Sequence, residues 1–217
     1  MKKVLILDYQ LGNLFSVNQA CKKVKIDSFV SSNWKDIKKC DAIILPGVGS
    51  FARAMKNIKS LDLVKPLEEF VIKEKPLFGI CLGMQLLFGR SEEFKSTKGL
   101  GYLKGTIKKF DNKKLTSMRV KVPQIGWNTI HSVDSRSWKN SPLKNLKNND
   151  YMYFIHSFYA NPNNKSEIIS FTDYDNFKFA SSVSNNKNIF ATQFHPEKSG
   201  VLGIEIYRNW AKLNDLL

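Results

Sequence analysis

The segment PLFGICLGMQLLFG, residues 76–89, constrains the fold of this chain more than any other stretch of its sequence. An apolar run breaks at Gly79, passes through Cys81, meets Gly83 and then resumes with helical spacing. This pattern predicts a buried strand that turns sharply into a helix. The form Gly-x-Cys-x-Gly matches a nucleophile elbow, a strained turn in which side chains beside the nucleophile would collide with the neighbouring strand and helix.

The segments around this junction alternate between strand and helix. Residues 3–8, KVLILD, form a continuous apolar run, as expected for a strand in a sheet that is covered on both faces. Further strands are expected at residues 27–32, 41–47 and 76–81, and helices over residues 14–24, 51–58 and 66–75. The last of these helices begins with Pro66, which is favourable in a first turn. Alternation at this spacing predicts a parallel, doubly wound sheet with helices on both faces.

From Gly101 the pattern changes to short aromatic and β-branched segments that are separated by Asn, Asp, Ser and Pro. We expect antiparallel strands and additions to the sheet edge at residues 101–110, 118–123, 126–133, 151–159, 177–183 and 188–194. The chain ends with a helix over residues 202–213, with Ile204, Tyr207 and Trp210 in its apolar stripe. The 217 residues show no internal repeat and no low-complexity linker, so we expect an α/β fold in a single domain over residues 1–217.

The composition limits the classes of function. The formal net charge is +15, but the lysines are scattered among asparagines without interleaved aromatic residues, which is typical of a solvated basic surface rather than a nucleic-acid site. Attraction of a phosphorylated substrate or an acidic partner is the alternative. No apolar run is long enough to cross a bilayer, and Asp8 ends the first run too early for a signal peptide. We therefore expect a cytoplasmic protein that binds neither nucleic acid nor membrane.

The three cysteines, Cys21, Cys40 and Cys81, show no CxxC spacing. A disulfide framework or a zinc site is therefore not expected, no metal or other cofactor is predicted, and at least one thiol is free. Cys21 and Cys40 fit packing positions. Cys81 has two interpretations: a small buried apolar residue, or a nucleophile whose thiolate is favoured by the N-terminus of the following helix. In the second case the backbone N–H of Leu82 is available to an oxyanion.

Two further segments favour the nucleophile. In QFHPEKS, residues 193–199, His195 and Glu197 are two apart, so on an extended segment both side chains leave from the same face. Such a histidine can deprotonate a thiol while the carboxylate holds its other ring nitrogen. In LPGVGSF, residues 45–51, two glycines let the backbone approach a ligand and offer N–H groups to an anion. The respective alternatives are an exposed polar loop and an ordinary strand-to-helix loop. All three segments follow predicted strands of one sheet, so they converge on one crevice at its carboxyl edge.

With these segments in view, the chain resembles the class I glutamine amidotransferases. The matching segments run nearly end to end: DYQLGNLFSV, LPGVGSFARAM, GICLGMQLLF, SEEF, GLGYLKG, VPQIGWN, YFIHSFYA and QFHPEKSG. The resemblance implies a Cys81–His195–Glu197 triad that hydrolyses glutamine through a glutamyl thioester. The residues that it implies for glutamine and oxyanion binding are Gly47, Val48, Gly49, Leu82 and Gln85. In this family the PGVG loop is described as rearranging its backbone to complete the oxyanion hole when the partner is loaded.

The resemblance also implies a subunit interface. Lys198 and His156 match positions at or near the contact with the ammonia-accepting partner; the alternatives are a solvated lysine and a hydrogen-bonded structural histidine. The sequence departs from the family pattern at Gln10, where glycine is expected, and at Gln124, where histidine is commoner. Neither residue belongs to the triad, so these departures bear on the partner rather than on the chemistry.

Within the family, the chain is similar to subunits that pass ammonia to a barrel-shaped cyclase of histidine biosynthesis. The implied assembly is a heterodimer with that synthase. The alternative acceptor is an ATP-dependent sugar amidotransferase of surface-polysaccharide biosynthesis, which would use the same glutaminase chemistry. Two hypotheses of other classes stay open. One is a catalytically silent activating subunit, against which the intact triad argues; the other is a cysteine peptidase or hydrolase, against which Gln85 and the PGVG loop argue.

Overall fold

The computed structural model describes residues 2–94, 96–111, 121–134, 138–175 and 177–217. Its helices are α1 (Leu14–Lys23), α2 (Trp34–Lys39), α3 (Phe51–Ser60), α4 (Val64–Ile72), α5 (Leu82–Leu86) and α6 (Gly200–Leu213), with the 3₁₀ turns η1 (Lys165–Glu167) and η2 (Pro196–Lys198). Its strands are β1 (Val4–Leu7), β2 (Ser28–Ser31), β3 (Ala42–Leu45), β4 (Leu77–Ile80), β5 (Phe88–Ser91), β6 (Thr97–Lys98), β7 (Leu103–Lys109), β8 (Gln124–Ser132), β9 (Asp150–His156), β10 (Phe158–Pro162), β11 (Ile168–Tyr174), β12 (Phe177–Ser184) and β13 (Ile189–Thr192).

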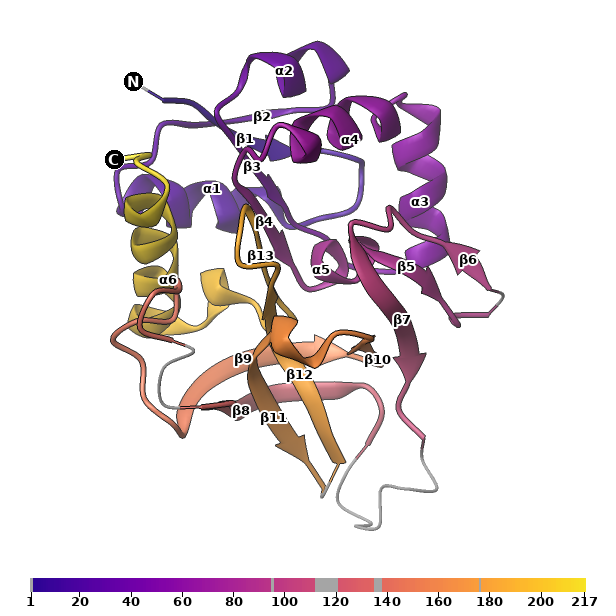
Figure 1. Cartoon of the computed structure of the whole chain (residues 1–217), viewed down its shortest axis with the longest axis vertical. Coiled ribbons are helices and arrows are strands. Elements are labelled where there is room, and N and C mark those ends of the chain that lie inside the picture. Colours follow the sequence, from indigo (N-terminus) through magenta and orange to yellow (C-terminus); the bar gives the residue numbers. More distant parts are fainter. Residues whose placement is uncertain (1, 95, 112–120, 135–137, 176) are drawn as a thin grey trace.

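A nine-stranded sheet in the order β2-β1-β3-β4-β13-β12-β11-β8-β9 forms the centre of the molecule (Figure 1). The strands from β2 to β13 pair in parallel, and every pair from β13 to β9 is antiparallel. Because β3, β4 and β13 are parallel neighbours, their carboxyl ends meet at one edge. The three segments singled out from the sequence follow these three ends.

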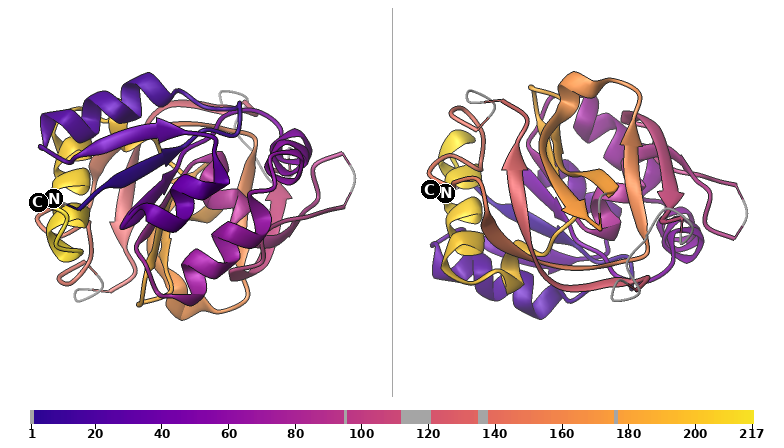
Figure 2. Two further views of the ribbon diagram at one scale, coloured as in Figure 1. Left: turned by 90° about the horizontal axis from the view of Figure 1, so that it is seen from above. Right: turned by 90° about the horizontal axis from the view of Figure 1, so that it is seen from below.

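A second sheet, in the order β10-β7-β5-β6, lies beside the antiparallel half of the first. Its strand β10 follows β9 after a single residue, Ser157, so the chain passes directly from one sheet to the other. The two termini lie close together beside α6 (Figure 2), where Lys2 Nζ donates a hydrogen bond to the main-chain carbonyl of Asn214. The second sheet closes one side of the crevice at the carboxyl edge.

Different helices bury the two faces of the parallel half. Val4 and Ile6 of β1 pack in one hydrophobic cluster with residues of α1 and α6, whereas Leu5 and Leu7 pack in the other with residues of α3 and α4. All four side chains are fully buried. Burial of each contributes about 1.5–3 kcal/mol, which explains why these strands appear in the sequence as unbroken apolar runs.

The predicted α/β fold is confirmed in its parallel half, with differences in detail. Helix α4 begins at Val64, so Pro66 is its third residue rather than its first, and helix α2 was not expected from the sequence. Helix α5 was expected to continue through the apolar residues after Cys81. It ends instead at Leu86, and Phe88 begins strand β5.

The second half of the chain differs more from the expected strands. Strand β13 was expected to be an antiparallel addition, but it is parallel to β4 in the middle of the sheet. Residues 151–159 were expected to form one strand and form two, β9 and β10, while β11 was not identified. Of the strand expected at residues 118–123, residues 118–120 lie outside the described residues and 121–123 are not in a strand. Strands β7, β8 and β12 confirm the expectations for residues 101–110, 126–133 and 177–183.

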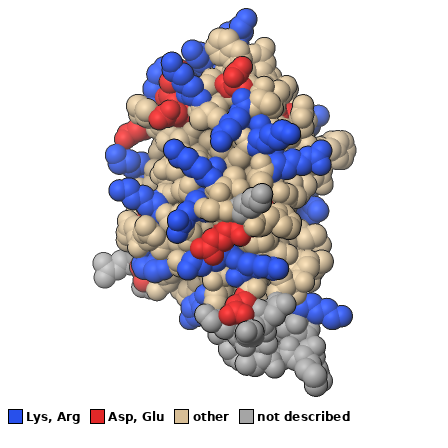
Figure 3. Space-filling model, turned by 90° about the vertical axis from the view of Figure 1, so that its right-hand side faces the viewer, with Lys and Arg blue, Asp and Glu red and all other residues tan. Residues whose placement is uncertain are grey.

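The surface is rich in basic side chains. Figure 3 shows lysines and arginines spread over one face with acidic side chains among them, rather than gathered into one stripe. This distribution agrees with a solvated basic surface on that face. Among the described residues, no helix combines the length and the apolar composition that a bilayer span requires.

Candidate active site

Cys81 lies in the turn between β4 and α5, in a strained conformation. Its φ is 53° and its ψ is −108°, a backbone geometry that residues other than glycine rarely adopt. The turn is crowded: a Cβ placed on Gly83 would lie 1.7 Å from the carbonyl oxygen of Leu45. A Cβ on Gly79 would lie 3.1 Å from the Cβ of Ala191. The glycines on both sides of the cysteine are therefore required by the close approach of strands β3 and β13.

The helix after the cysteine is shorter than the sequence indicated. Helix α5 contains five residues, Leu82–Leu86, and its macrodipole is correspondingly small. The expected stabilisation of a thiolate by this helix is therefore a minor effect. The larger charge near the sulfur belongs to a histidine.

His195 and Glu197 follow the neighbouring strand β13. His195 directly precedes the turn η2, and Glu197 lies within it. His195 Nδ1 and Glu197 Oε1 are 2.7 Å apart, and both side chains are only 2% exposed. The segment is fixed to β9, because Ser199 Oγ donates to the carbonyl of His195 and accepts from the N–H of Tyr153. Among the described residues, Nε2 of His195 has no hydrogen-bond partner, so this nitrogen is available for proton transfer.

The electrostatics favour a protonated His195. Burial lowers the pKa of His195, but its interactions with Cys81, and then with Glu197, raise that pKa to about 10. Imidazolium is therefore the favoured form at neutral pH. A histidine with this charge stabilises a thiolate on the neighbouring cysteine, which is the nucleophilic form of the side chain.

Two buried glutamines connect the cysteine to the wall of the site. Gln85 Nε2 donates to the carbonyl of Phe158 at 2.9 Å and to Gln193 Oε1 at 3.1 Å. Gln193 Nε2 in turn contacts Cys81 Sγ at 3.6 Å. Cys81 Sγ also lies 3.8 Å from the carbonyl oxygen of Ile155. These contacts fix the position of the sulfur at the edge of a cavity.

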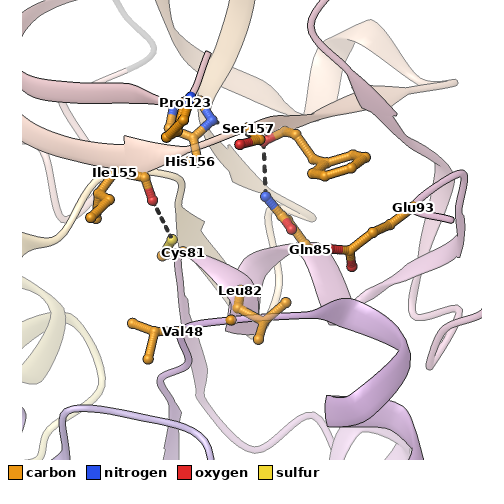
Figure 4. A pocket seen from close by; sticks show the side chains of 11 residues that line it. Val48, Cys81, Leu82, Gln85, Glu93, Pro123, Ile155, His156 and Ser157 are labelled. Carbon is orange, nitrogen blue, oxygen red and sulfur yellow. Dashed lines mark hydrogen bonds between the residues drawn. The ribbon is translucent and has the colours of Figure 1, made fainter.

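The cavity has a volume of about 260 Å³ and opens beside Cys81 (Figure 4). It is lined by Val48, Gly49, Cys81, Leu82, Gln85, Glu93, Pro123, Ile155, His156, Ser157 and Phe158. Among these lining residues, Glu93 provides the only carboxylate. The volume is sufficient for a single amino acid, and a lone carboxylate opposite a nucleophile suits a substrate with one cationic group.

The structure closes the predicted oxyanion site. The N–H of Leu82 donates to the carbonyl oxygen of Gly47 at 3.3 Å, so it is not available to a ligand in this conformation. Gly49 has a φ of 98°, a conformation suited to glycine. Val48, between Gly47 and Gly49, is 38% exposed. The segment must rearrange before the N–H of Leu82 can bind an oxyanion.

The two residues predicted for the interface differ in their surroundings. Lys198 is exposed, and its Nζ lies 5.7 Å from the centre of the Tyr153 ring. His156 is 6% exposed, and its Nδ1 lies 2.8 Å from the carbonyl oxygen of Phe158, so Nδ1 carries the proton and donates it. Burial lowers the pKa of His156 to about 4, which keeps the ring neutral. The buried ring fits the structural interpretation of His156 better than direct contact with a partner.

The family is established by comparison with known proteins. The chain belongs to the class I glutamine amidotransferase family, whose model, Glutamine amidotransferase class-I, matches residues 5–212. The chain is accordingly a glutaminase of the cysteine-nucleophile type, as the sequence predicted.

Particular relatives are also similar over nearly the whole chain. The chain is 41% identical over 212 residues to imidazole glycerol phosphate synthase subunit HisH 1 of Campylobacter jejuni, which covers 97% of this chain and 100% of the relative. It is 41% identical over 209 residues to imidazole glycerol phosphate synthase subunit HisH of Methanocaldococcus jannaschii, covering 96% and 98%. The fold matches PurLQS from Thermotoga maritima with a TM-score of 0.70 at 15% identity, covering 97% of this chain and 98% of the other. The predicted fold class is thereby confirmed.

Two residues of the site were not identified from the sequence. Gln193 is the first residue of the QFHPEKS segment, and Glu93 lies in the SEEF segment that contributed to the family resemblance. Their positions could have been noted, but the contact of Gln193 with Cys81 and the orientation of Glu93 into the cavity depend on the packing of distant elements. A spacing rule does not supply that information.

Proposed function

We propose that this chain is the glutaminase subunit of an imidazole glycerol phosphate synthase, and that it supplies ammonia to a cyclase partner for histidine biosynthesis. The observation that carries the proposal is the arrangement of Cys81, His195 and Glu197, three buried groups at adjacent strand ends beside a cavity of amino-acid size. The near full-length similarity to HisH subunits supports the choice of pathway.

The first half of the reaction begins at the sulfur of Cys81. The thiolate attacks the side-chain amide carbon of glutamine, a C–S bond forms, and the π electrons of the carbonyl move to its oxygen. The oxyanion then collapses and the C–N bond breaks. The imidazolium of His195 gives its proton to the departing nitrogen, so the nitrogen leaves as ammonia. Glu197 keeps the ring oriented and stabilises its positive charge.

The second half removes the glutamyl group. His195, now neutral, takes a proton from water as the water oxygen attacks the thioester carbon. The C–S bond breaks, glutamate leaves, and the thiolate–imidazolium pair is restored. The oxyanion that forms in each half requires N–H donors, for which Leu82 is the candidate once the Gly47 carbonyl has moved away.

Glu93 is the group that recognises the substrate as an amino acid. Its Oε2 accepts a hydrogen bond from the N–H of Phe51 at 2.5 Å, which fixes the carboxylate at the cavity wall. Figure 4 shows the Glu93 carboxylate beside Gln85 on one wall of the cavity. A glutamine bound with its amide at Cys81 directs its α-ammonium group to this carboxylate.

The substitution Glu93→Gln is expected to raise the KM for glutamine about 10- to 100-fold with little change in kcat, because it removes one charged hydrogen bond to the substrate. Glutamine at this position keeps an oxygen for the N–H of Phe51, so the fold is preserved. Steady-state kinetics of the purified variant measure the effect. Glu92→Gln is the matched control, since Glu92 is exposed and does not line the cavity. An unchanged KM in Glu93→Gln would contradict this assignment.

The partner is proposed to dock on the outer face of β8 and β9, next to the cavity mouth. Trp127 packs against Tyr153 across the two strands, with ring centroids 6.1 Å apart. The exposed apolar side chains of the pair are Ile125 at 61%, Trp127 at 55%, Tyr151 at 58% and Ile155 at 38%. Exposed aromatic residues of this density are typical of protein interfaces. Ile155 also lines the cavity, so this surface is continuous with the site that releases ammonia.

The experiment is to follow glutamate release by the purified chain, alone and with a barrel-shaped cyclase that carries its phosphorylated ligand. We expect slow release from the isolated chain, because the N–H of Leu82 is occupied, and a marked increase with the loaded cyclase. Equal rates in both conditions would reject the dependence on a partner. Stimulation by an ATP-dependent sugar amidotransferase, but not by the cyclase, would reject the histidine pathway and keep the glutaminase chemistry.

A further inference from the structure

Tyr9 has a buried hydroxyl beside Gly47, whose carbonyl oxygen accepts the N–H of Leu82. The side chain follows β1, is 1% exposed and packs in the hydrophobic cluster that contains Leu45 and Leu82. Its main-chain carbonyl accepts a hydrogen bond from Asn57 Nδ2 at 2.9 Å. The hydroxyl itself has no hydrogen-bond partner in the described part of the chain. A buried hydroxyl without a hydrogen-bond partner lowers the stability of the fold. Its position beside the loop therefore points to a role in another conformation of that loop.

The position of the hydroxyl relative to Gly47 provides that reason. A Cβ built on Gly47 would lie 1.8 Å from the Tyr9 hydroxyl oxygen, so this oxygen lies directly against the α-carbon of the glycine. The carbonyl of the same glycine accepts the N–H of Leu82 at 3.3 Å. The one group that must move to open the oxyanion site is therefore adjacent to an unused hydrogen-bond donor.

The chemistry of the two groups is complementary. Burial, and then the negative charge of Cys81, raise the pKa of Tyr9 well above its ordinary value, so the hydroxyl keeps its proton and can donate it. A carbonyl oxygen only accepts. In a trans peptide the C=O and the N–H lie in one plane and point in opposite directions. Rotation of the peptide between Gly47 and Val48 therefore withdraws the oxygen from Leu82 and turns the N–H of Val48 toward the cavity.

We propose that the Tyr9 hydroxyl is a positioning group for the active conformation of the loop, in which it donates a hydrogen bond to the carbonyl oxygen of Gly47. This exchange of partners frees the N–H of Leu82 for the oxyanion without loss of a hydrogen bond to the moved carbonyl. It also gives the hydroxyl the partner that it lacks in the resting conformation. The inference rests on the proposed glutaminase function and adds the group that holds the loop in its active form.

The test uses Tyr9→Phe in the full chain, because phenylalanine keeps the ring and removes only the donor. We expect the kcat for glutamine hydrolysis by the isolated chain to fall about tenfold, the effect of one hydrogen bond. We expect the KM for glutamine to change by less than about twofold, since the hydroxyl does not touch the substrate. The Tm should not fall, because the hydroxyl makes no hydrogen bond to the described residues in the resting conformation. Alkylation of Cys81 by iodoacetamide, which forms no oxyanion, should keep the wild-type rate.

Tyr102→Phe is the matched control. The hydroxyl of Tyr102 is also without a partner among the described residues, and the side chain does not line the cavity, so its kcat should equal that of the wild type. A wild-type kcat in Tyr9→Phe would overturn the proposal while leaving the glutaminase function in place. A lower Tm together with slower alkylation would also overturn it, since both indicate a purely structural role. A wild-type chain that hydrolyses no glutamine, alone or with the loaded cyclase, would reject the proposed function and this inference together.

Discussion

Replacement of Cys81 with alanine is expected to reduce glutamine hydrolysis by about 10⁴-fold or more, because no other group can form the glutamyl thioester. Cys81 is the cysteine that borders the cavity, and its sulfur is held there by contacts with Gln193 and Ile155. The loss should be in kcat, since the cavity wall that binds the substrate is unchanged. Glutamate release with the loaded cyclase present measures it at the highest wild-type rate.

The other two cysteines provide the controls. Burial raises the pKa of Cys21 and the pKa of Cys40 to about 12, so both thiols stay protonated and unreactive at neutral pH. Cys40→Ala should therefore keep wild-type activity. An electrophilic analogue of glutamine should label Cys81 alone, as peptide mapping would show. Label on Cys21 or Cys40, or normal glutamate release by Cys81→Ala, would refute the nucleophile assignment.

The second large effect is expected for His195→Ala, with glutamine hydrolysis reduced about 10³-fold by loss of the general acid and base. The same change should slow alkylation of Cys81 by iodoacetamide at neutral pH, since the imidazolium that favours the thiolate is gone. The pKa of His195 is raised to about 10, so the charged ring is present below this value and is lost as the pH rises through it. His195→Ala should therefore slow the alkylation throughout the range from neutral pH to about pH 9, in which the wild-type ring is charged.

His131→Ala is the control for the loss of an imidazole. The His131 ring stacks on Phe171 on the antiparallel side of the sheet, with centroids 5.3 Å apart, and does not line the cavity. Glutamine hydrolysis by the His131→Ala variant should match that of the wild type. If His195→Ala formed the thioester at the wild-type rate, another base would have to exist and the role proposed for His195 would be wrong.

The elements predicted best from the sequence are those in which one short segment contains all the necessary information. Residues Val4–Leu7 and Leu77–Ile80 are buried on both faces, and a short apolar run bounded by polar or turn residues is typical of a strand in a covered sheet. The elbow at Cys81 was predicted because its glycines reflect local crowding that any such turn imposes. His195 and Glu197 were placed on one face by their spacing alone, and their 2.7 Å contact agrees with that reasoning.

What could not be predicted depends on partners distant in the sequence. The four residues of β13 pair with β4 on one side and β12 on the other, and an apolar run of this length does not reveal the direction of its neighbours. The break at Ser157 is invisible in an aromatic segment whose residues suit a strand throughout. The Tyr9 hydroxyl can lie at its observed position only because Gly47, almost forty residues later, has no side chain there.

Strand β9 has a consequence for how this enzyme can evolve. Its outward residues Tyr151 and Tyr153 alternate with the inward residues Met152 and Phe154, so surface and core are encoded by interleaved positions of one strand. On the docking face proposed above, mutations at the outward positions would alter the choice of acceptor, while the inward positions preserve the packing next to the catalytic centre. After gene duplication, a copy could thus be recruited to a new biosynthetic route by a few substitutions on this face, without any change to the residues of the catalytic centre.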